Sequence, residues 1–206
     1  MKTGIDPRRT GAALVATLAA LGTSGALAGE IADRAQRAEQ LIGEALAGGD
    51  EADETLASKA LAELDGVVDA FWREMPLRFR TAIFAEAGSV KAFGKYQPRQ
   101  NAFSSGETVT IYVEPVGYGF FVTGAKFDID LAAGVEIRSP GGIVFAEAPE
   151  FGRLEWTGRA RSREVHGSIS VSLPELKPGD YEIVVTLIDE ATGKTARAEL
   201  PLILGN

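Results

Sequence analysis

Three arginines alternate along one short segment, and their spacing is suited to binding an anion. Arg159, Arg161 and Arg163 are separated by single residues, and Trp156 precedes them. In an extended strand, alternate side chains share a face, so the three guanidinium groups would form one positive stripe. Guanidinium groups bind carboxylates and phosphates through paired hydrogen bonds. The stripe predicts a site for an acidic glycan, a phosphate group or an acidic protein surface. The alternative is a solvated strand face that pairs with the chain's own acids.

A second segment combines glycines with aromatic rings directly after a predicted strand. It runs from Glu114 to Phe121 with the sequence EPVGYGFF. Proline ends a strand ladder and glycine opens further backbone angles, so we expect a loop here. The rings of Tyr118 and Phe120 would stack on a sugar or a partner, because a ring offers a large contact area at low entropic cost. We expect Glu114 at the rim of this surface. The alternative is that the rings cap the sandwich core or receive the helical hairpin.

Residues for the common hydrolytic and metal chemistries are scarce. His166 is the only histidine, and the chain has neither cysteine nor a G-x-S-x-G motif. A zinc site with two histidines and thiol catalysis are therefore excluded. The aspartates do not have the spacing of a calcium loop; they are Asp128, Asp130, Asp180 and Asp189. We predict no catalytic residue, no metal and no cofactor. The alternative is a pair of carboxylates that meet only in the fold, as in a glycoside hydrolase.

Composition describes an acidic globular protein. The chain has 206 residues, a formal net charge of −8 and a hydrophobic content of 45%. This suits one domain with a small appendage and argues against disorder. An acidic chain has no general attraction for nucleic acid or for an anionic bilayer, so we predict neither as a partner.

The N-terminal segment, residues 1–28, predicts a signal peptide. It begins with the basic residues Lys2, Arg8 and Arg9 and continues with a short apolar run over residues 11–21. The small residues around Ala28 predict cleavage between Ala28 and Gly29. The apolar run is too short to span a bilayer, which needs about 20 residues. We therefore predict export to the periplasm or the extracellular space, by general secretion or the twin-arginine route, with no transmembrane segment in the mature chain.

Residues 29–86 predict a helical hairpin. Apolar residues recur at three- and four-residue steps from Glu30 to about Phe84, with a glycine-rich break at residues 48–50. Asp50 or Asp53 can cap the second helix, and Pro76 ends or kinks it. A hairpin cannot bury its apolar stripe alone. It must dock on the rest of the chain, on a partner or on a second copy.

Residues 87–206 predict an antiparallel β-sandwich of about seven short strands. Alternating or β-branched segments are separated by turn signals, with no helical pattern between them. These segments are residues 107–114, 125–131, 135–137, 143–145, 166–173, 181–189 and 194–204. Residues 146–163 are the longest irregular stretch. The chain as a whole is predicted to be α+β.

The segment Leu176 to Tyr181, with the sequence LKPGDY, resembles the tyrosine corner of immunoglobulin-like and fibronectin-like sandwiches. The resemblance covers about residues 103–204. It implies that the Tyr181 hydroxyl bonds back to the preceding loop and that Pro178 and Gly179 belong to this structural motif. Residues 93–120 also resemble exported bacterial proteins of uncharacterised function, a likeness that implies no activity.

Together these patterns predict a non-enzymatic, exported binding or accessory module of the bacterial envelope. Its contact surfaces would be the segment around Tyr118 and the arginine strand. Its partner would be an envelope protein or an acidic glycan. The alternatives are a glycan hydrolase with a carboxylate pair, and a structural protein whose helical stripe forms a homo-oligomer.

Overall fold

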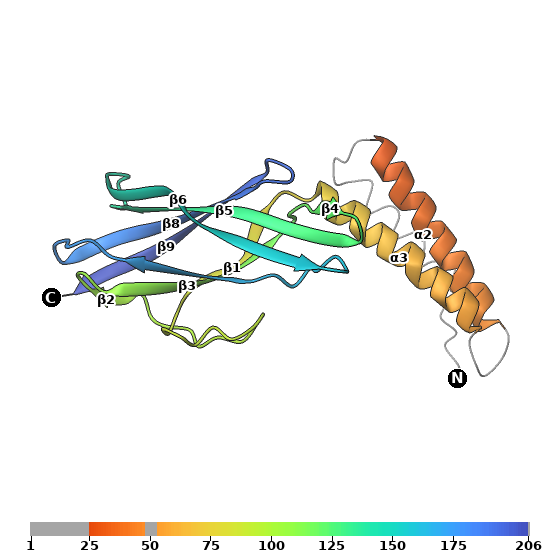
Figure 1. Ribbon diagram of the computed structural model, residues 1–206, viewed down its shortest axis with the longest axis horizontal. Coiled ribbons are helices and arrows are strands. Elements are labelled where there is room, and N and C mark those ends of the chain that lie inside the picture. Colours follow the sequence, from red (N-terminus) through yellow and green to blue (C-terminus); the bar gives the residue numbers. More distant parts are fainter. Residues whose placement is uncertain (1–24, 48–52, 206) are drawn as a thin grey trace, which may run out of the picture. The chain divides into compact units, whose positions relative to one another are not determined.

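The structure is a computed structural model that describes residues 25–47 and 53–205, divided into two compact units. The first unit, Met1–Glu74, contains helices α2 (Gly25–Leu46) and α3 (Glu54–Glu74). The second, Met75–Asn206, contains nine strands in its described part (Figure 1). The predicted α+β class is confirmed. Neither α2 nor α3 is long and apolar enough to cross a membrane.

Short side chains form much of the contact between the two helices. The buried residues of α2 and α3 are Leu27, Ile31, Ala38, Ala45, Ala60, Ala70 and Trp72. Alanines let helices approach closely, because little side-chain volume separates them. The carboxylate of Asp53 caps α3 by accepting hydrogen bonds from the backbone N–H groups of Thr55 and Leu56, at 2.9 and 3.0 Å.

The predicted cleavage site lies inside α2. This helix begins at Gly25 and continues through Ala28 and Gly29. Leu27 is buried in a cluster with Ile31 and Ala70. The rest of the predicted signal peptide, residues 1–24, lies outside the described residues.

The helical pattern ends earlier than the sequence analysis predicts. The helical unit ends at Glu74, and residues 78–85 form strand β1 (Arg78–Ala85) of the second unit. The assigned boundary at residues 86 and 87 is therefore displaced. Pro76 prevents α3 from continuing, and the following RFRTAIFA alternates as a strand does.

Two sheets form a β-sandwich. The smaller has the strand order β1-β3-β7, and the larger has the order β2-β9-β8-β5-β4, with β6 paired to β5. Their bounds are β2 (Ala102–Ser104), β3 (Thr108–Val116), β4 (Phe121–Thr123), β5 (Lys126–Arg138), β6 (Val144–Gly158), β7 (Gly167–Ser172), β8 (Gly179–Asp189) and β9 (Thr195–Gly205). All pairs are antiparallel except β2 with β9.

The core lies between the two sheets and contains large apolar side chains. Alternate residues of the long strands are buried, which is the period-two pattern that sequence analysis used for β5, β7 and β8. The most deeply buried include Ile111, Val113, Ile129, Leu131, Ile183 and Leu187. The stretch predicted to be irregular, residues 146–163, is strand β6 as far as Gly158.

Strand β6 is an edge strand of the larger sheet, since it pairs with β5 alone. Its ladder is interrupted where the partner of Ala133 is Gly152 and the partner of Val135 is Ala148. Three residues of β6, Pro149 to Phe151, therefore stand opposite Gly134. This is a β-bulge with two extra residues on β6, which interrupts the regular ladder.

The tyrosine of the LKPGDY segment makes the bond that the resemblance implies. The Tyr181 hydroxyl donates to the backbone carbonyl oxygen of Lys177 at 2.8 Å. Tyr181 is buried at the start of β8, and Gly179 is the first residue of that strand. The bond fixes the chain where it enters β8.

Candidate functional site

The segment around Tyr118 and the segment with the three arginines are joined in the structure. Tyr118 follows β3, and Ser162 lies in the connection between β6 and β7, over residues 159–166. The Tyr118 hydroxyl donates to the carbonyl oxygen of Ser162 at 2.9 Å. This bond fastens the arginine-bearing connection to the aromatic segment.

Tyr118 is an anchor rather than an exposed contact. The prediction that it lies on the surface of a loop is wrong, because its exposed fraction is 0%. Burial raises the pKa of its hydroxyl, and the nearby guanidinium groups of Arg80 and Arg163 act in the opposite direction.

Gly117 produces the turn that buries Tyr118. Its φ is 82°, which favours glycine, and a Cβ there would lie 2.3 Å from the carbonyl oxygen of Pro76. The chain therefore bends directly after β3. The predicted loop begins later than expected, since β3 continues through Pro115 to Val116.

The bend after β3 is held by the turn between β8 and β9. The buried carboxylate of Asp189 accepts a hydrogen bond from the Gly119 N–H at 2.7 Å. The Lys194 ammonium donates to the carbonyl oxygens of Gly117 and Met75, at 3.0 and 2.7 Å. These bonds fix residues 117–119 from both sides, so the segment is a firm support for what lies on it.

Contacts between aromatic rings connect Tyr118 with Arg161. Phe120 makes edge contacts with Tyr118 and Phe127, with centroid separations of 5.7 and 6.1 Å. The Arg161 guanidinium lies over the Phe127 ring, 4.6 Å from its centroid. Phe120 and Phe127 are both half-buried, so each ring keeps an accessible part.

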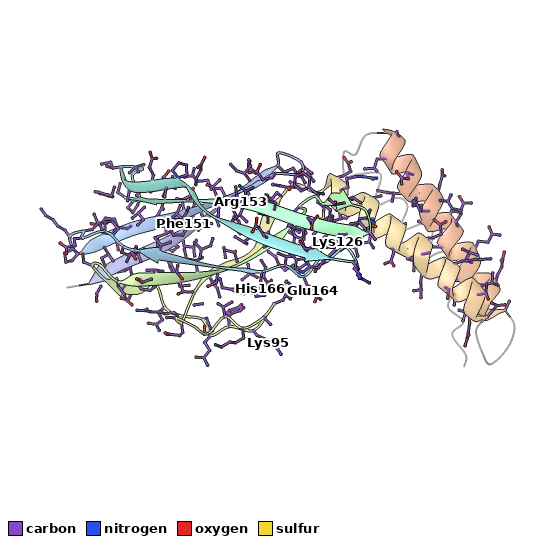
Figure 2. All side chains as sticks on the ribbon, in the orientation of Figure 1. Lys95, Lys126, Phe151, Arg153, Glu164 and His166 are labelled. Carbon is purple, nitrogen blue, oxygen red and sulfur yellow. The ribbon has the colours of Figure 1, made fainter. Side chains whose placement is uncertain are left out.

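The arginines do not occupy a strand. The predicted extended stripe is wrong, because β6 ends at Gly158 and Arg159, Arg161 and Arg163 all lie in the connection to β7. Arg159 and Arg161 are exposed, and Arg163 is half-buried. Figure 2 shows the same connection continuing through Glu164 and His166.

Trp156 lies on β6, just before this strand ends at Gly158. It is half-buried on β6, and a Cβ on Gly158 would lie 2.1 Å from its ring. The indole therefore covers Gly158, whose partner in the ladder is Phe127. A larger side chain at this position would require the indole to shift.

We call the set Phe120, Phe127, Arg159, Arg161 and Arg163 the aromatic–arginine surface. Val122 adds to its apolar part, because it pairs with Phe127 and has an exposed fraction of 61%. The Arg161 guanidinium thus stands beside a partly exposed ring. This combination suits a ligand that has both an apolar face and a negative group.

Glu114 is not part of this surface. Its expected place at a rim is wrong, because it lies within β3 with an exposed fraction of 6%. Its carboxylate accepts hydrogen bonds from the hydroxyl groups of Tyr112, at 2.5 Å, and Thr81, at 3.1 Å. Alternation along β3 places Glu114 on the outer face of the smaller sheet, where sequence alone gives no sign of a cover.

Residues 86–101 supply that cover. The Tyr96 ring stacks on Tyr112 with a centroid separation of 4.0 Å, and the Gly94 N–H donates to the Tyr112 hydroxyl at 2.8 Å. His166 lies farther away, with ring centroids 6.0 Å apart. Figure 2 shows Lys95 on this covering segment. The cluster is satisfied internally, which fits a structural role.

The described ranges, 25–47 and 53–205, contain no group of three or more histidine, aspartate or glutamate side chains that could hold a metal ion. The two aspartates closest to the aromatic–arginine surface on β5 have partners. Asp128 accepts a hydrogen bond from Thr157 at 2.7 Å, and Asp130 pairs with Arg153 at 2.6 Å.

Comparison with known proteins gives structural likenesses only. No protein-family model matches the chain, and a search of curated proteins finds no significant match. Among solved structures, CopC from Methylosinus trichosporium OB3b is 11% identical with a TM-score of 0.31, covering 60% of this chain and 93% of its own.

Two further solved structures are similar to a comparable degree. The CARDB domain of the PF1109 protein from Pyrococcus furiosus is 10% identical with a TM-score of 0.29, covering 63% of this chain and 90% of its own. The cellulose-active LPMO CelS2 is 14% identical with a TM-score of 0.31, covering 82% and 95%. The fold assignment rests on this chain's own strand pairing, because likenesses at these values carry no functional argument.

Proposed function

We propose that this protein is an exported, non-enzymatic binding module of the bacterial envelope, with an immunoglobulin-like sandwich, and that its aromatic–arginine surface holds an acidic glycan. The observation that carries the proposal is the Tyr118–Ser162 hydrogen bond. It joins the two segments with binding chemistry and places Arg161 over Phe127.

The chemistry of the surface favours a sugar acid. A uronic acid residue has an apolar ring face, which packs on an aromatic ring, and a carboxylate, which a guanidinium binds with two hydrogen bonds. Phe120 and Phe127 supply the rings, and Arg159 and Arg161 supply exposed guanidinium groups. A positive site on a chain with a net charge of −8 also selects locally for anions that the rest of the surface repels.

The rigidity of the support adds to the proposal. Asp189 and Lys194 fix residues 117–119, and Tyr118 in turn fixes the connection at Ser162. A preformed surface loses less conformational entropy when a ligand binds, so more of the contact energy appears as affinity.

Calorimetric titration with oligogalacturonate tests this function. We expect binding that weakens as salt rises, and no binding of the carboxyl-reduced oligosaccharide. The double variant Arg159→Gln/Arg161→Gln should bind about tenfold more weakly or worse. The matched control is Arg153→Gln, which removes an exposed arginine of β6 that pairs with Asp130, and it should bind as the parent does.

Two results would overturn the proposal. Equal affinity for the charged and reduced oligosaccharides would show that the guanidinium groups do not recognise the ligand. Shortened oligosaccharide products after incubation would instead support the hydrolase alternative, which needs two carboxylates facing a bound sugar.

A further inference from the structure

Both helices of the hairpin carry large apolar side chains that are exposed in the part of the chain that the structure describes. On α3 these are Leu61, Leu64 and Val68, with exposed fractions of 64%, 39% and 43%. On α2 they are Ile42 and Leu46, with 39% and 63%. The spacings of three, four and seven residues put each set on one face of its helix. We call these five residues the open face.

The open face lies on one side of the hairpin, and ion pairs mark the other side. Arg34 and Arg37 of α2 pair with Glu63 of α3, with N–O distances of 3.3 and 3.2 Å. Residues of a helix are spaced by about 100°, which places Val68 about 140° from Glu63 and Ile42 about 140° from Arg37. The two helices therefore turn their remaining apolar side chains to the same side.

The distribution of side-chain size indicates that the open face is an interface. Four of the seven residues buried in α2 and α3 are alanines, whereas three leucines, an isoleucine and a valine are exposed. Exposed single apolar residues are ordinary, but a contiguous set from two helices marks a contact surface. Such a surface fits an amphipathic helix laid along the hairpin.

The charged residues around the open face indicate which kind of partner would bind there. Glu39 lies one turn before Ile42 on α2, and Asp65 lies between Leu61 and Val68 on α3. Both carboxylates are exposed, and no ion pair found among the described residues involves either. The arginines of the hairpin lie on the opposite side with Glu63 and Glu30. The open face therefore has acidic edges and no basic one.

We propose that the open face binds a basic amphipathic helix of another protein. Apolar side chains of that helix would cover the five exposed residues, and its lysines or arginines would reach Glu39 and Asp65. A second copy of this hairpin fits less well, because its own acidic edges would face these carboxylates. The open face belongs to the helical unit and the aromatic–arginine surface to the strand unit, and the proposal does not depend on glycan binding.

A designed peptide tests the open face on the full chain. The probe is an 18-residue helix of leucine and lysine with leucines at i, i+3, i+4 and i+7, labelled for fluorescence anisotropy. We expect saturable binding that is at least about tenfold tighter than that of the same peptide with glutamine in place of lysine. A neutral peptide is the right comparison, because an acidic one would be attracted to the arginines elsewhere.

Variants locate the contact. Leu61→Gln/Val68→Gln should abolish peptide binding while the helical circular dichroism stays unchanged, because both side chains are exposed. Glu39→Lys/Asp65→Lys should weaken binding about tenfold or more. Glu44→Lys is the matched control. Glu44 is exposed on the same helix as Ile42 but two residues away, about 200° around the axis.

Three results would overturn the proposal. The first is equal binding of the lysine and glutamine peptides. The second is binding that survives Leu61→Gln/Val68→Gln. The third is a concentration-dependent dimer, measured by light scattering, that these substitutions abolish, since it would assign the open face to a second copy.

Discussion

The hairpin and the sandwich differ in the size of most of the side chains that they bury. The sandwich buries many large apolar residues almost completely, including Ile111, Leu131 and Leu187. Of the seven residues buried in α2 and α3, four are alanines, whereas Leu61, Leu64 and Ile42 are exposed. The difference indicates that the sandwich is stabilised by its own core, whereas the hairpin still has apolar surface to lose to a partner.

The largest loss of stability should follow a substitution in the core of the sandwich. Leu187→Ala is expected to lower the free energy of unfolding by about 3 kcal/mol, because Leu187 is fully buried and the change leaves a cavity. Denaturant unfolding measures this. The neighbouring Ile188→Ala is the control, since Ile188 is 41% exposed and should lose much less.

The second-largest loss of stability is expected at the cluster of Tyr112, Glu114 and Tyr96 on the smaller sheet. Tyr112→Phe removes a donor from the buried carboxylate of Glu114 and is expected to cost about 2 kcal/mol. Tyr96→Phe is the control, because the stacked ring is kept. An unfolding free energy equal to that of the parent would show that the carboxylate does not need this donor.

The same cluster predicts a dependence on high pH. Burial, together with the bond to Glu114, raises the pKa of Tyr112 to about 12. The folded state therefore favours the neutral phenol. Its stabilising contribution is complete below the unfolded pKa of about 10 and is lost as pH rises through about 12. Absorbance of tyrosinate during a pH titration measures this step, which should be missing in Tyr112→Phe.

A smaller effect is expected where the chain enters β8. Tyr181→Phe should cost about 1 kcal/mol, because it removes one hydrogen bond to a backbone carbonyl. Lys177→Ala should cost less, since the bond uses the main chain of Lys177 and not its side chain. Equal losses in the two variants would contradict the role given to the hydroxyl.

The smallest effect should come from the open face. Leu61→Ala is expected to change stability by less than about 0.5 kcal/mol, because Leu61 is 64% exposed. Ile31→Ala, at an exposed fraction of 1%, should cost about 2 kcal/mol or more in the same hairpin. If Leu61 were as costly as Ile31, the contrast between the two units would fail.

Local patterns predicted much of the sandwich. Alternation identified most of β3, β5, β7, β8 and β9, and the LKPGDY segment placed the start of β8. β1 was missed because its apolar residues continued a helical count, although Pro76 was the available signal for a new element. The alternating arginines imitated a strand, but Gly158 ends β6 before them.

The candidate site could be predicted only in part. Its residue types were visible, but Tyr118 and Ser162 are 44 residues apart, and only the tertiary fold shows that they are bonded. The sequence also does not reveal that Glu114 is buried. Alternation places this residue near the end of a strand, but it gives no sign that residues 86–101 cover it.

The bulge in β6 has a consequence for the chain at high concentration. A straight edge strand of 15 residues would offer unpaired backbone groups to other sheets, and successive copies could extend it into a fibre. Pro149 lacks an N–H to donate, and the three residues opposite Gly134 break the even spacing that a growing ladder requires. The bulge in β6 therefore disfavours fibril formation when the protein reaches a high concentration.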